Sequence, residues 1–345
     1  MKAVYITEQG GLDVLQYGDL PEPEIGPDEV KIRVRATALN HLDVYTRAGV
    51  RGTRRELREP LVLGIDIAGE VAAVGEHVFN VRPGDRVAVN PVITCGRCEY
   101  CVRGRDNLCV SRVMIGTMVN GGYAEYAKAP WENVLPIPDG ISYEEACGIP
   151  LVAMTAYHML VTRAGLQPGD DVLVMAAGSG VGSVGIQIAK ALGARVIATA
   201  GTDEKAERGR QLGADHVINY RANPEYAKTV RELTGGKGVD IVFDHVGAAV
   251  WEQNIASLKP GGVLVNCGVT SGYRMELQMG YLFTHELSVL GSELGTKAEL
   301  ARVMKLVRDG KVRGVVSRTF PLQEAREAHR AMEERDHFGK LVLVP

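Results

Sequence analysis

The sequence predicts an α/β protein with two domains, a compact β-barrel-like body followed by a doubly wound parallel sheet. The chain has 345 residues, which is enough for two hydrophobic cores. Its first forty residues have the alternation of β-strands, broken by proline and glycine. From Asp171 onwards, strand-like and helix-like segments alternate, which is the pattern of a parallel sheet with crossover helices.

The composition argues against several classes of protein. The formal net charge is only −3, so the chain lacks the basic surface expected for binding nucleic acid or an anionic membrane. No apolar run reaches the length of a membrane-spanning helix, and the N-terminal segment lacks the apolar core of a signal peptide. We therefore expect a cytoplasmic protein with neither nucleic acid nor a membrane as its partner.

The first domain is expected to consist mainly of strands. Its N-terminal part is interrupted by Pro21, Pro23 and Pro27, and one short helix is expected at 40–48. Ser142 and Glu145 have the spacing of a capping box, at the start of a helical stretch that runs to about residue 163. The expected strands are 2–7, 15–19, 29–38, 63–74, 86–90 and 121–127.

Four of the six cysteines lie close together in the sequence. Cys95, Cys98 and Cys101 form a C-x-x-C-x-x-C pattern, and Cys109 follows after seven residues. Four thiolates at this spacing can surround one tetrahedral zinc, which leaves no coordination position for a substrate. The alternatives are two disulfides, which are rare in the cytosol, or an iron–sulfur cluster, which does not suit the surrounding fold. We expect one structural zinc per subunit.

A glycine-rich turn carries the strongest functional signal of the second domain. Residues 172–175 are an apolar run, Gly178, Gly180 and Gly182 follow, and apolar residues then recur at helical spacing. With the next expected strand at 195–200, this makes a βαβ unit. Its glycines and its helix N-terminus suit the pyrophosphate of a dinucleotide. A plain turn without a ligand is the alternative.

The alternation of helices and strands continues to the C-terminus. Helices are expected at 204–212, 225–233 and 249–258, and strands at 214–219, 240–244, 262–267 and 285–291. After Lys297 the expected order is helix (298–308), strand (315–320), helix (322–334) and strand (340–344). We expect these last elements to fold back onto the first domain.

Six blocks make the sequence similar to the medium-chain dehydrogenase/reductase superfamily over nearly its whole length. They are ATALNHLDVYTRAG (36–49), LGIDIAGEV (63–71), the cysteine block (95–109), AAGSGVG (176–182), ATAGTDEKAERGRQLGADHVINY (198–220) and FGKLVLV (338–344). The cysteine block is typical of the zinc-type alcohol dehydrogenase branch, whereas the glycine turn and VINY resemble the quinone oxidoreductase branch. The resemblance implies a GroES-like β-barrel catalytic domain at 1–150, completed by 296–345, and a Rossmann NAD(P)-binding domain at 151–295.

The resemblance fails at the catalytic zinc of the alcohol dehydrogenase branch. Asn40 stands at the position of the cysteine ligand, Ile65 at that of the histidine, and Leu151 or a neighbour at that of the third ligand. Asp66 stands at the position of the glutamate after the histidine. Isoleucine and leucine cannot coordinate zinc, and asparagine alone is a poor ligand. Cys147 is nearby as a substitute, although a small buried residue is the simpler interpretation, so we expect no catalytic zinc.

Without that zinc, we expect hydride transfer from NADPH to an electron-poor carbon of a quinone or an α,β-unsaturated carbonyl. The protein then positions two reactants and donates a hydrogen bond to the oxygen that gains charge. Asn40, Asp43 and Tyr45 match the N-x-x-D-x-Y segment of the quinone oxidoreductase branch. The resemblance implies that Tyr45 or Asn40 is the donor beside the nicotinamide, and that Asp43 holds the loop. A packed aromatic is the alternative for Tyr45.

The end of the second strand of the Rossmann domain bears on the choice of cofactor. In NAD enzymes an acidic residue there binds the ribose 2′-hydroxyl, but this strand ends ATAGT, without a carboxylate before Asp203. Thr202, Lys205 and Tyr220 match the NADPH contacts of the quinone oxidoreductase branch. We expect NADP(H), with NAD(H) as the alternative. The other cofactor-binding residues that the resemblance implies are Gly178, Gly180, Val181, Gly182, Gly247 and Gly268.

Two further functions stay open at this point. One is an NAD(P)-dependent alcohol dehydrogenase or aldehyde reductase, for which two zinc ions per subunit would be evidence. The other is a non-catalytic nucleotide-binding protein, which would bind NADPH without turnover. For the enzymes the partner is a small-molecule carbonyl or quinone. The pairing of relatives at the strand 285–291 implies a homodimer or a homotetramer.

Overall fold

The chain folds into two units in the computed structural model, which describes residues 1–345. The first unit comprises Met1–Leu151 together with Arg313–Pro345, and the second comprises Val152–Val312. Helix α4 (Pro150–Tyr157) carries the chain from one to the other. Every helix is too short or too polar to span a lipid bilayer.

The first unit is built mainly from β-strands. Its strands are β1 (Lys2–Ile6), β2 (Gln16–Asp19), β3 (Glu29–Ala38), β4 (Leu61–Val62), β5 (Asp66–Val74), β6 (Arg86–Val89), β7 (Val92–Ile93), β8 (Val113–Met114), β9 (Tyr126–Pro130), β10 (Val134–Pro136), β17 (Val316–Pro321) and β18 (Lys340–Val344). Its helices are η1 (Leu12–Val14), α1 (His41–Ala48), α2 (Glu99–Val102), η2 (Asp106–Leu108), η3 (Trp131–Asn133), α3 (Tyr143–Cys147), η6 (Leu322–Glu324) and α11 (Ala325–Glu333).

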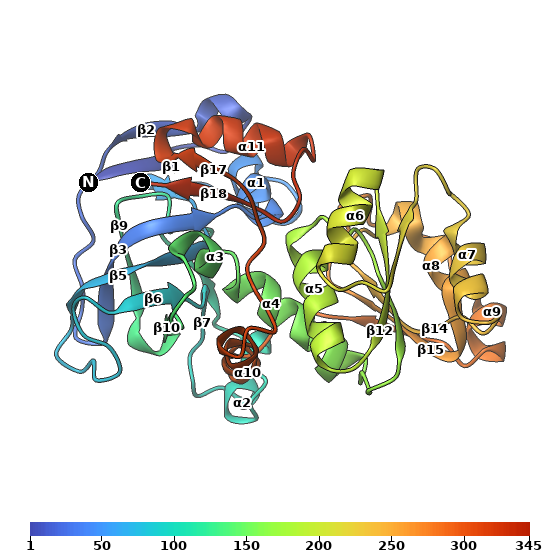
Figure 1. The fold of residues 1–345 in the computed structure, drawn as a ribbon. Coiled ribbons are helices and arrows are strands. Elements are labelled where there is room, and N and C mark those ends of the chain that lie inside the picture. The colour runs from blue at the N-terminus through green and yellow to red at the C-terminus, as the bar shows by residue number, and fades with distance from the viewer. The chain divides into compact units, whose positions relative to one another are not determined.

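Strand β3 lies at the centre of the main sheet of the first unit. The strand order is β10-β6-β5-β3-β18-β17, and β9 also pairs with β3. The C-terminal strand β18 runs antiparallel to β3, with Val342 opposite Ala38, while β5 places Asp66 opposite Ala38. Figure 1 shows the red β17 and β18 beside the blue N-terminal strands. The ends of β3, β5 and β18 therefore meet next to the start of α1.

The apolar face of α11 fastens the C-terminal segment onto this unit. Ala325, Ala328 and Met332 are buried in one cluster with residues of β1 and with Leu341 and Leu343 of β18. Burying each leucine side chain contributes about 1.5–3 kcal/mol to the stability of the fold. The C-terminal elements were expected to fold back onto the first domain, and hydrophobic packing holds them against the first unit.

One expected strand of the first unit begins later in the chain than its sequence indicates. Residues 121–127 were expected to form it, but β9 begins at Tyr126. Gly121 and Tyr123 instead donate backbone hydrogen bonds to Val62 and Leu63. A Cβ at Gly121 would lie 2.2 Å from the carbonyl oxygen of Gly64, so this close crossing of two backbones requires glycine.

The second unit is a doubly wound parallel sheet, as the alternation of elements predicts. Its strands are β11 (Asp171–Val174), β12 (Arg195–Ala200), β13 (His216–Asn219), β14 (Val239–Asp244), β15 (Leu258–Asn266) and β16 (Ser288–Gly291), in the order β13-β12-β11-β14-β15-β16. Helices α5 (Gly180–Ala191) and α6 (Asp203–Gln211) cover one face, and α7 (Tyr226–Leu233) and α8 (Trp251–Ser257) cover the other (Figure 1). The remaining helices are η4 (His158–Arg163), η5 (Ala248–Val250), α9 (Met279–Thr284) and α10 (Lys297–Arg308).

Helix α10 belongs to the second unit, whereas the sequence analysis assigned everything after 296 to the first domain. A buried polar contact explains the difference. The carboxylate of Glu299 lies 2.9 Å from Nδ1 of His158 and also accepts a hydrogen bond from Thr162. Both partners lie in η4, and the chain rejoins the first unit only at Arg313.

Candidate functional site

The glycine turn of the second unit has a geometry that suits a phosphate group. Ser179 caps helix α5, and its Oγ accepts a hydrogen bond of 2.8 Å from the backbone N–H of Gly182. A Cβ at Gly182 would lie 2.3 Å from the carbonyl oxygen of Ala176, so only glycine fits there. Helix α5 thus begins directly behind a close backbone turn, where its N-terminal amides and dipole favour an anion.

A histidine that the sequence analysis missed joins this turn to the neighbouring strand. His245 follows β14, and its Nε2 lies 2.7 Å from Oγ of Ser179. Burial lowers the pKa of His245 to about 4, so the ring is neutral at pH 7. Its Nδ1 is buried and has no hydrogen-bond partner. The contact links the carboxyl ends of β11 and β14, where the strand order reverses and open α/β sheets bind their ligands.

The end of β12 offers hydroxyl and cationic groups rather than a carboxylate. A Cβ at Gly201 would lie 2.9 Å from the hydroxyl of Tyr220 and 3.5 Å from Nε of Arg221. Thr202 caps α6 by accepting a hydrogen bond from the backbone N–H of Lys205. The carboxylate of Asp203 accepts a hydrogen bond of 2.8 Å from the side chain of Asn219. Arg221 is a second residue that the sequence analysis missed.

The other predicted cofactor residues lie in the same unit. Val181 is half-buried in the first turn of α5. Gly247 has a φ of +90°, a conformation that favours glycine, and a Cβ at Gly268 would lie 2.8 Å from the carbonyl oxygen of His245. Together with Gly178 and Gly180, which follow β11, these residues come after parallel strands at the carboxyl edge of the sheet.

The first unit contains a buried cluster of four polar side chains, which we call the lysine cluster: Asn40, Asp43, Asp66 and Lys340. Nζ of Lys340 donates to Oδ1 of Asn40 at 2.6 Å and to Oδ2 of Asp66 at 2.9 Å. Nδ2 of Asn40 donates to the same oxygen of Asp66 at 2.9 Å. The side chains of Lys340 and Asp66 are 4% and 0% exposed, so this ion pair is shielded from water.

Asp43 forms several hydrogen bonds to the backbone around this cluster. Its carboxylate accepts hydrogen bonds from the backbone N–H groups of Asn40, Gly64 and Ile65 at 2.7, 3.1 and 3.2 Å. Complete burial raises the pKa of Asp43 from 3.8 to about 7, against the opposite effect of these hydrogen bonds. The proximity of Asp66 raises this pKa further, while Lys340 lowers it.

The two candidate hydrogen-bond donors differ in how they are engaged. Nδ2 of Asn40 donates to Asp66 and, at 3.4 Å, to the carbonyl oxygen of Ala38, so both of its hydrogens are used. Tyr45 is half-buried on α1, with the ring of His41 at 6.1 Å and the guanidinium of Arg51 at 5.0 Å from its own ring centre. The engagement of both amide hydrogens argues against Asn40 as the donor to a substrate.

The residues of the lysine cluster do not fit a catalytic zinc. Oδ1 of Asn40 and Oδ2 of Asp66 already contact an ammonium group. Ile65 is fully buried and has no donor atom. Cys147 is also buried; its Sγ lies 3.2 Å from the carbonyl oxygen of Glu144, and burial keeps the pKa of its thiol well above 9. These donors provide no thiolate or imidazole of the kind that zinc prefers.

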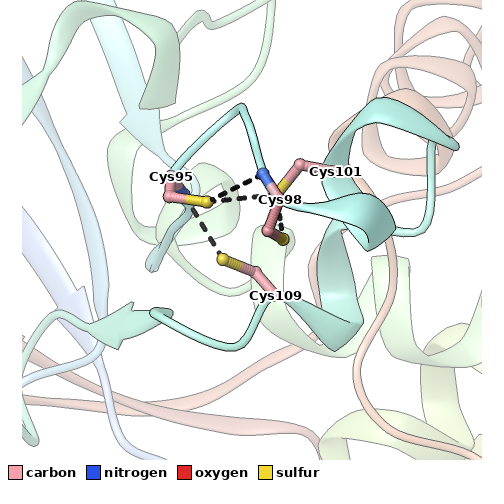
Figure 2. A group of neighbouring side chains, drawn as sticks. All are labelled: Cys95, Cys98, Cys101 and Cys109. Atoms are coloured by element: carbon pink, nitrogen blue, oxygen red, sulfur yellow. Dashed lines mark hydrogen bonds between the residues drawn. The ribbon is translucent and has the colours of Figure 1, made fainter.

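The four clustered cysteines, in contrast, fit a zinc ion (Figure 2). Their sulfur atoms lie within 4.8 Å of one another, and all six cysteines of the chain are free. Sγ of Cys101 lies 3.5 Å from that of Cys98 and 3.9 Å from that of Cys95. Tetrahedral zinc with bonds of about 2.3 Å requires sulfur separations of about 3.8 Å. Backbone N–H groups lower the pKa of Cys95 and Cys98, whereas burial raises the pKa of Cys101 to about 12.

The structure thus groups the predicted residues in two separate sets. All predicted cofactor residues lie in the second unit, and the candidate catalytic residues and the four cysteines lie in the first. Three functional candidates were missed: Lys340, His245 and Arg221. Lys340 belongs to the block FGKLVLV, but only the pairing of β18 with β3 brings it to Asn40.

Known proteins match the chain over its full length. The alcohol dehydrogenase GroES-like domain family matches residues 26–139, and the zinc-binding dehydrogenase family matches residues 180–309. An acryloyl-coenzyme A reductase from Sulfurisphaera tokodaii is 31% identical over 346 residues, covering 100% of both chains. A quinone oxidoreductase from Pseudomonas aeruginosa is 33% identical over 353 residues, covering 100% of this chain and 99% of its own.

Solved structures match equally well. The crystal structure of an NAD-dependent alcohol dehydrogenase superposes with a TM-score of 0.96 and 48% sequence identity, with 100% of both chains covered. These relatives are oxidoreductases with the same two kinds of domain, and the GroES-like and Rossmann-type folds expected from the sequence are confirmed. The chain is therefore an oxidoreductase that belongs to the medium-chain dehydrogenase/reductase superfamily, with a GroES-like domain and a zinc-binding-dehydrogenase domain.

Proposed function

We propose that this enzyme reduces a quinone or an α,β-unsaturated carbonyl with NADPH and uses no metal at its reaction centre. The observation that carries the proposal is the lysine cluster. Oδ1 of Asn40 and Oδ2 of Asp66 contact the ammonium of Lys340, and the cluster contains no cysteine or histidine. Acceptors that are already electron-poor need no Lewis acid, whereas oxidation of a simple alcohol requires either a Lewis acid or a general base to activate it. The acryloyl-coenzyme A reductase and the quinone oxidoreductase among the relatives support this class of substrate.

The chain's own residues have three roles in this proposal. The N-terminus of α5 and the turn at Gly182 bind the diphosphate of the dinucleotide, which when bound supplies the reducing equivalent. The hydroxyl of Tyr45 donates a hydrogen bond to the substrate oxygen that gains negative charge. One such donor contributes about 2.7–4 kcal/mol to the stabilisation of a transition state. Asp43 and Lys340 hold the backbone and the amide of Asn40 beside it.

The residues after β12 support NADPH as the cofactor. Tyr220 and Arg221 lie close to Gly201, which follows β12. An arginine near the end of this strand can bind a 2′-phosphate. Lys205 and Thr202 at the start of α6 complete the group. The opposing observation is the 48% identical relative named an NAD-dependent alcohol dehydrogenase. Measuring kcat/KM with both cofactors decides this point, and a clear preference for NADH would refute NADPH.

We further propose that one zinc ion binds to Cys95, Cys98, Cys101 and Cys109 and has only a structural role. The donor set is closed, because four thiolates complete a tetrahedral shell. Cys101 lies in α2, and the other three cysteines lie in the loops around α2 and η2, so the metal ties together a lobe that also contains the short pair β7 and β8. The other expectations, a cytoplasmic location and a homodimer or homotetramer pairing through β16, are proposals that fractionation and light scattering can test.

An NAD-dependent alcohol dehydrogenase is the second candidate, because the name of the 48% identical relative favours it. The two functions are separated by assaying one preparation with three groups of substrates: quinones, enones or enoyl thioesters, and primary and secondary alcohols. We expect NADPH-dependent reduction of the first two groups at least 100-fold more efficiently than oxidation of the alcohols. Efficient alcohol oxidation accompanied by a second zinc per chain would replace the proposal with the second candidate.

A further inference from the structure

We propose that the ammonium group of Lys340 is the permanent cation of a site formed by Asp66 and Asn40, and that it keeps a divalent metal out of that site. This inference deepens the proposed function, since it rests on a reaction centre without metal. Its tests read metal binding and thermal stability, so they remain informative if the proposed substrate class is wrong.

The backbone pairing delivers the lysine to this position. Strand β18 runs antiparallel to β3 with Val342 opposite Ala38 and a hydrogen bond of 2.9 Å from the N–H of Leu39 to the carbonyl of Leu341. Continuing this register places Lys340 next to Asn40. Gly339 precedes it with a φ of +91°, and a Cβ there would lie 2.2 Å from the carbonyl oxygen of Val315. The start of β18 is therefore fixed by backbone packing rather than by the lysine itself.

The oxygen atoms around Nζ are those of a hard-cation site. Oδ2 of Asp66 and Oδ1 of Asn40 contact the ammonium at 2.9 and 2.6 Å, and Oδ1 of Asp66 is buried without a hydrogen-bond partner. Carboxylate and amide oxygens are the ligands that Mg²⁺, Ca²⁺ and Mn²⁺ prefer. A buried carboxylate requires a counter-charge, and Lys340 supplies it. It thereby occupies the space between the two oxygen donors.

The same contacts make Lys340 a positioning residue for Asn40. The ammonium can only donate, so it fixes which end of the Asn40 amide is the oxygen. Nδ2 of Asn40 must then point to Asp66, as it does at 2.9 Å. These contacts fix the backbone just before α1. They therefore also fix where α1 places Tyr45, about one turn later.

The decisive experiment compares wild type, Lys340→Ala, Lys340→Met and Asp66→Asn in metal-free buffer. Bound Mn²⁺ is counted by electron paramagnetic resonance, and unfolding is followed by differential scanning fluorimetry. Lys340→Ala removes the ammonium and leaves space for a cation, whereas Lys340→Met removes the charge and fills the space. Lys190→Ala is the matched control, because Lys190 forms an ion pair of similar length with Asp215, but at a surface where both side chains are about one-third exposed.

We expect Lys340→Ala to bind about one Mn²⁺ per chain that wild type does not bind, and its melting temperature to rise with added Mn²⁺. Lys340→Met should melt about 5–10 °C below wild type and show no response to Mn²⁺. Adding Asp66→Asn to either lysine variant should abolish Mn²⁺ binding and recover at least half of the lost melting temperature. The control should match wild type in both measurements.

Three results would overturn the inference. The first is that wild type binds Mn²⁺ at a site that Asp66→Asn removes, and the second is that Lys340→Ala binds no more Mn²⁺ than wild type. The third is that the double variant loses as much stability as the two single variants together. The comparison of Lys340→Met with its double variant also decides the matter if Lys340→Ala does not fold. Lys340→Arg, which keeps the charge, should stay within a few degrees of wild type; a loss as large as that of Lys340→Met would mean that shape rather than charge is required.

Discussion

The cysteine lobe and the lysine cluster are both groups of four polar side chains in the first unit, but they have opposite chemistry. The cysteines come from one segment of 15 residues, 95–109, and form a closed set of soft ligands. The lysine cluster comes from positions 40, 43, 66 and 340 and is a set of oxygens with its own cation. The cysteines have the donor atoms for a metal, whereas in the proposed account the ammonium of Lys340 takes the place of one. In the proposed account, this chain keeps the architecture of the superfamily and the structural metal site of the alcohol dehydrogenase branch, but not the catalytic metal site of that branch.

The largest effect is expected when the cysteine lobe is broken. Substituting Cys98→Ser together with Cys101→Ser removes two of four thiolates, so zinc should fall from about one per chain to near zero, measured by inductively coupled plasma mass spectrometry. The melting temperature should drop by more than about 10 °C, because structural zinc contributes folding energy directly. Cys267→Ser, which lies outside the cluster, should keep its zinc. Unchanged stability in the double variant would show that the lobe needs no metal.

The second prediction is that catalysis depends on Tyr45 and the lysine cluster rather than on the cysteine lobe. Tyr45→Phe should lower kcat by about 100-fold with little change in KM, because a donor to the developing charge acts mainly in the transition state. At a temperature where it remains folded, the double cysteine variant should keep kcat within a factor of about three. If the cysteine variant loses activity and Tyr45→Phe does not, the roles of the two regions are reversed.

The third prediction concerns the lysine cluster, which is more buried than the cysteine lobe. Its residue Asp43 should make the stability of the folded chain depend on pH. Asp43 has a pKa raised to about 7, so between pH 4 and 7 the folded chain holds a proton that the unfolded chain releases. Its contribution to stability is therefore greatest below about pH 4 and declines as the pH rises to 7. Asp43→Asn removes this dependence. The stability of wild type relative to the variant should fall by about 2–4 kcal/mol between pH 4 and pH 8 in urea unfolding.

Parallel pH curves for the two proteins would contradict this assignment. Two of the buried histidines, His245 and His329, have lowered pKa values of about 4 and about 3, which give the opposite slope, since stability rises with pH as their unfolded forms lose protons. They are present in both proteins, so their contribution cancels in the difference.

The smallest effect concerns the cofactor, which neither cluster should influence. Arg221→Ala should raise the KM for NADPH about 10-fold and leave that for NADH unchanged, as expected for the loss of one charge-assisted contact of about 1.4 kcal/mol. Glu207→Ala on the same unit, which removes a surface ion pair with Arg210, is the control. An equal effect on both cofactors would mean that Arg221 supports the loop rather than a 2′-phosphate.

The contrast between the two regions also explains what could be predicted. The cysteine lobe and the glycine turn are contiguous, so spacing alone indicated their ligands, and the alternation after Asp171 predicted the parallel sheet. The resemblance to the superfamily also implied that Asn40, Ile65, and Leu151 or a neighbour stand at the positions of zinc ligands. Lys340 could not be found in this way, because its contact with Asn40 depends on the register of β18 against β3. The contact of His245 with Ser179 and the proximity of Arg221 to Gly201 likewise depend on strands that only the sheet brings together.

Anomalous diffraction at the zinc absorption edge, from crystals of the wild-type enzyme with NADPH, tests the central claim most directly. The account predicts one zinc peak per chain, surrounded by the sulfurs of Cys95, Cys98, Cys101 and Cys109, and an ammonium of Lys340 in contact with Asp66. A second peak within coordination distance of Asp66 and Asn40, with Lys340 displaced, would contradict it.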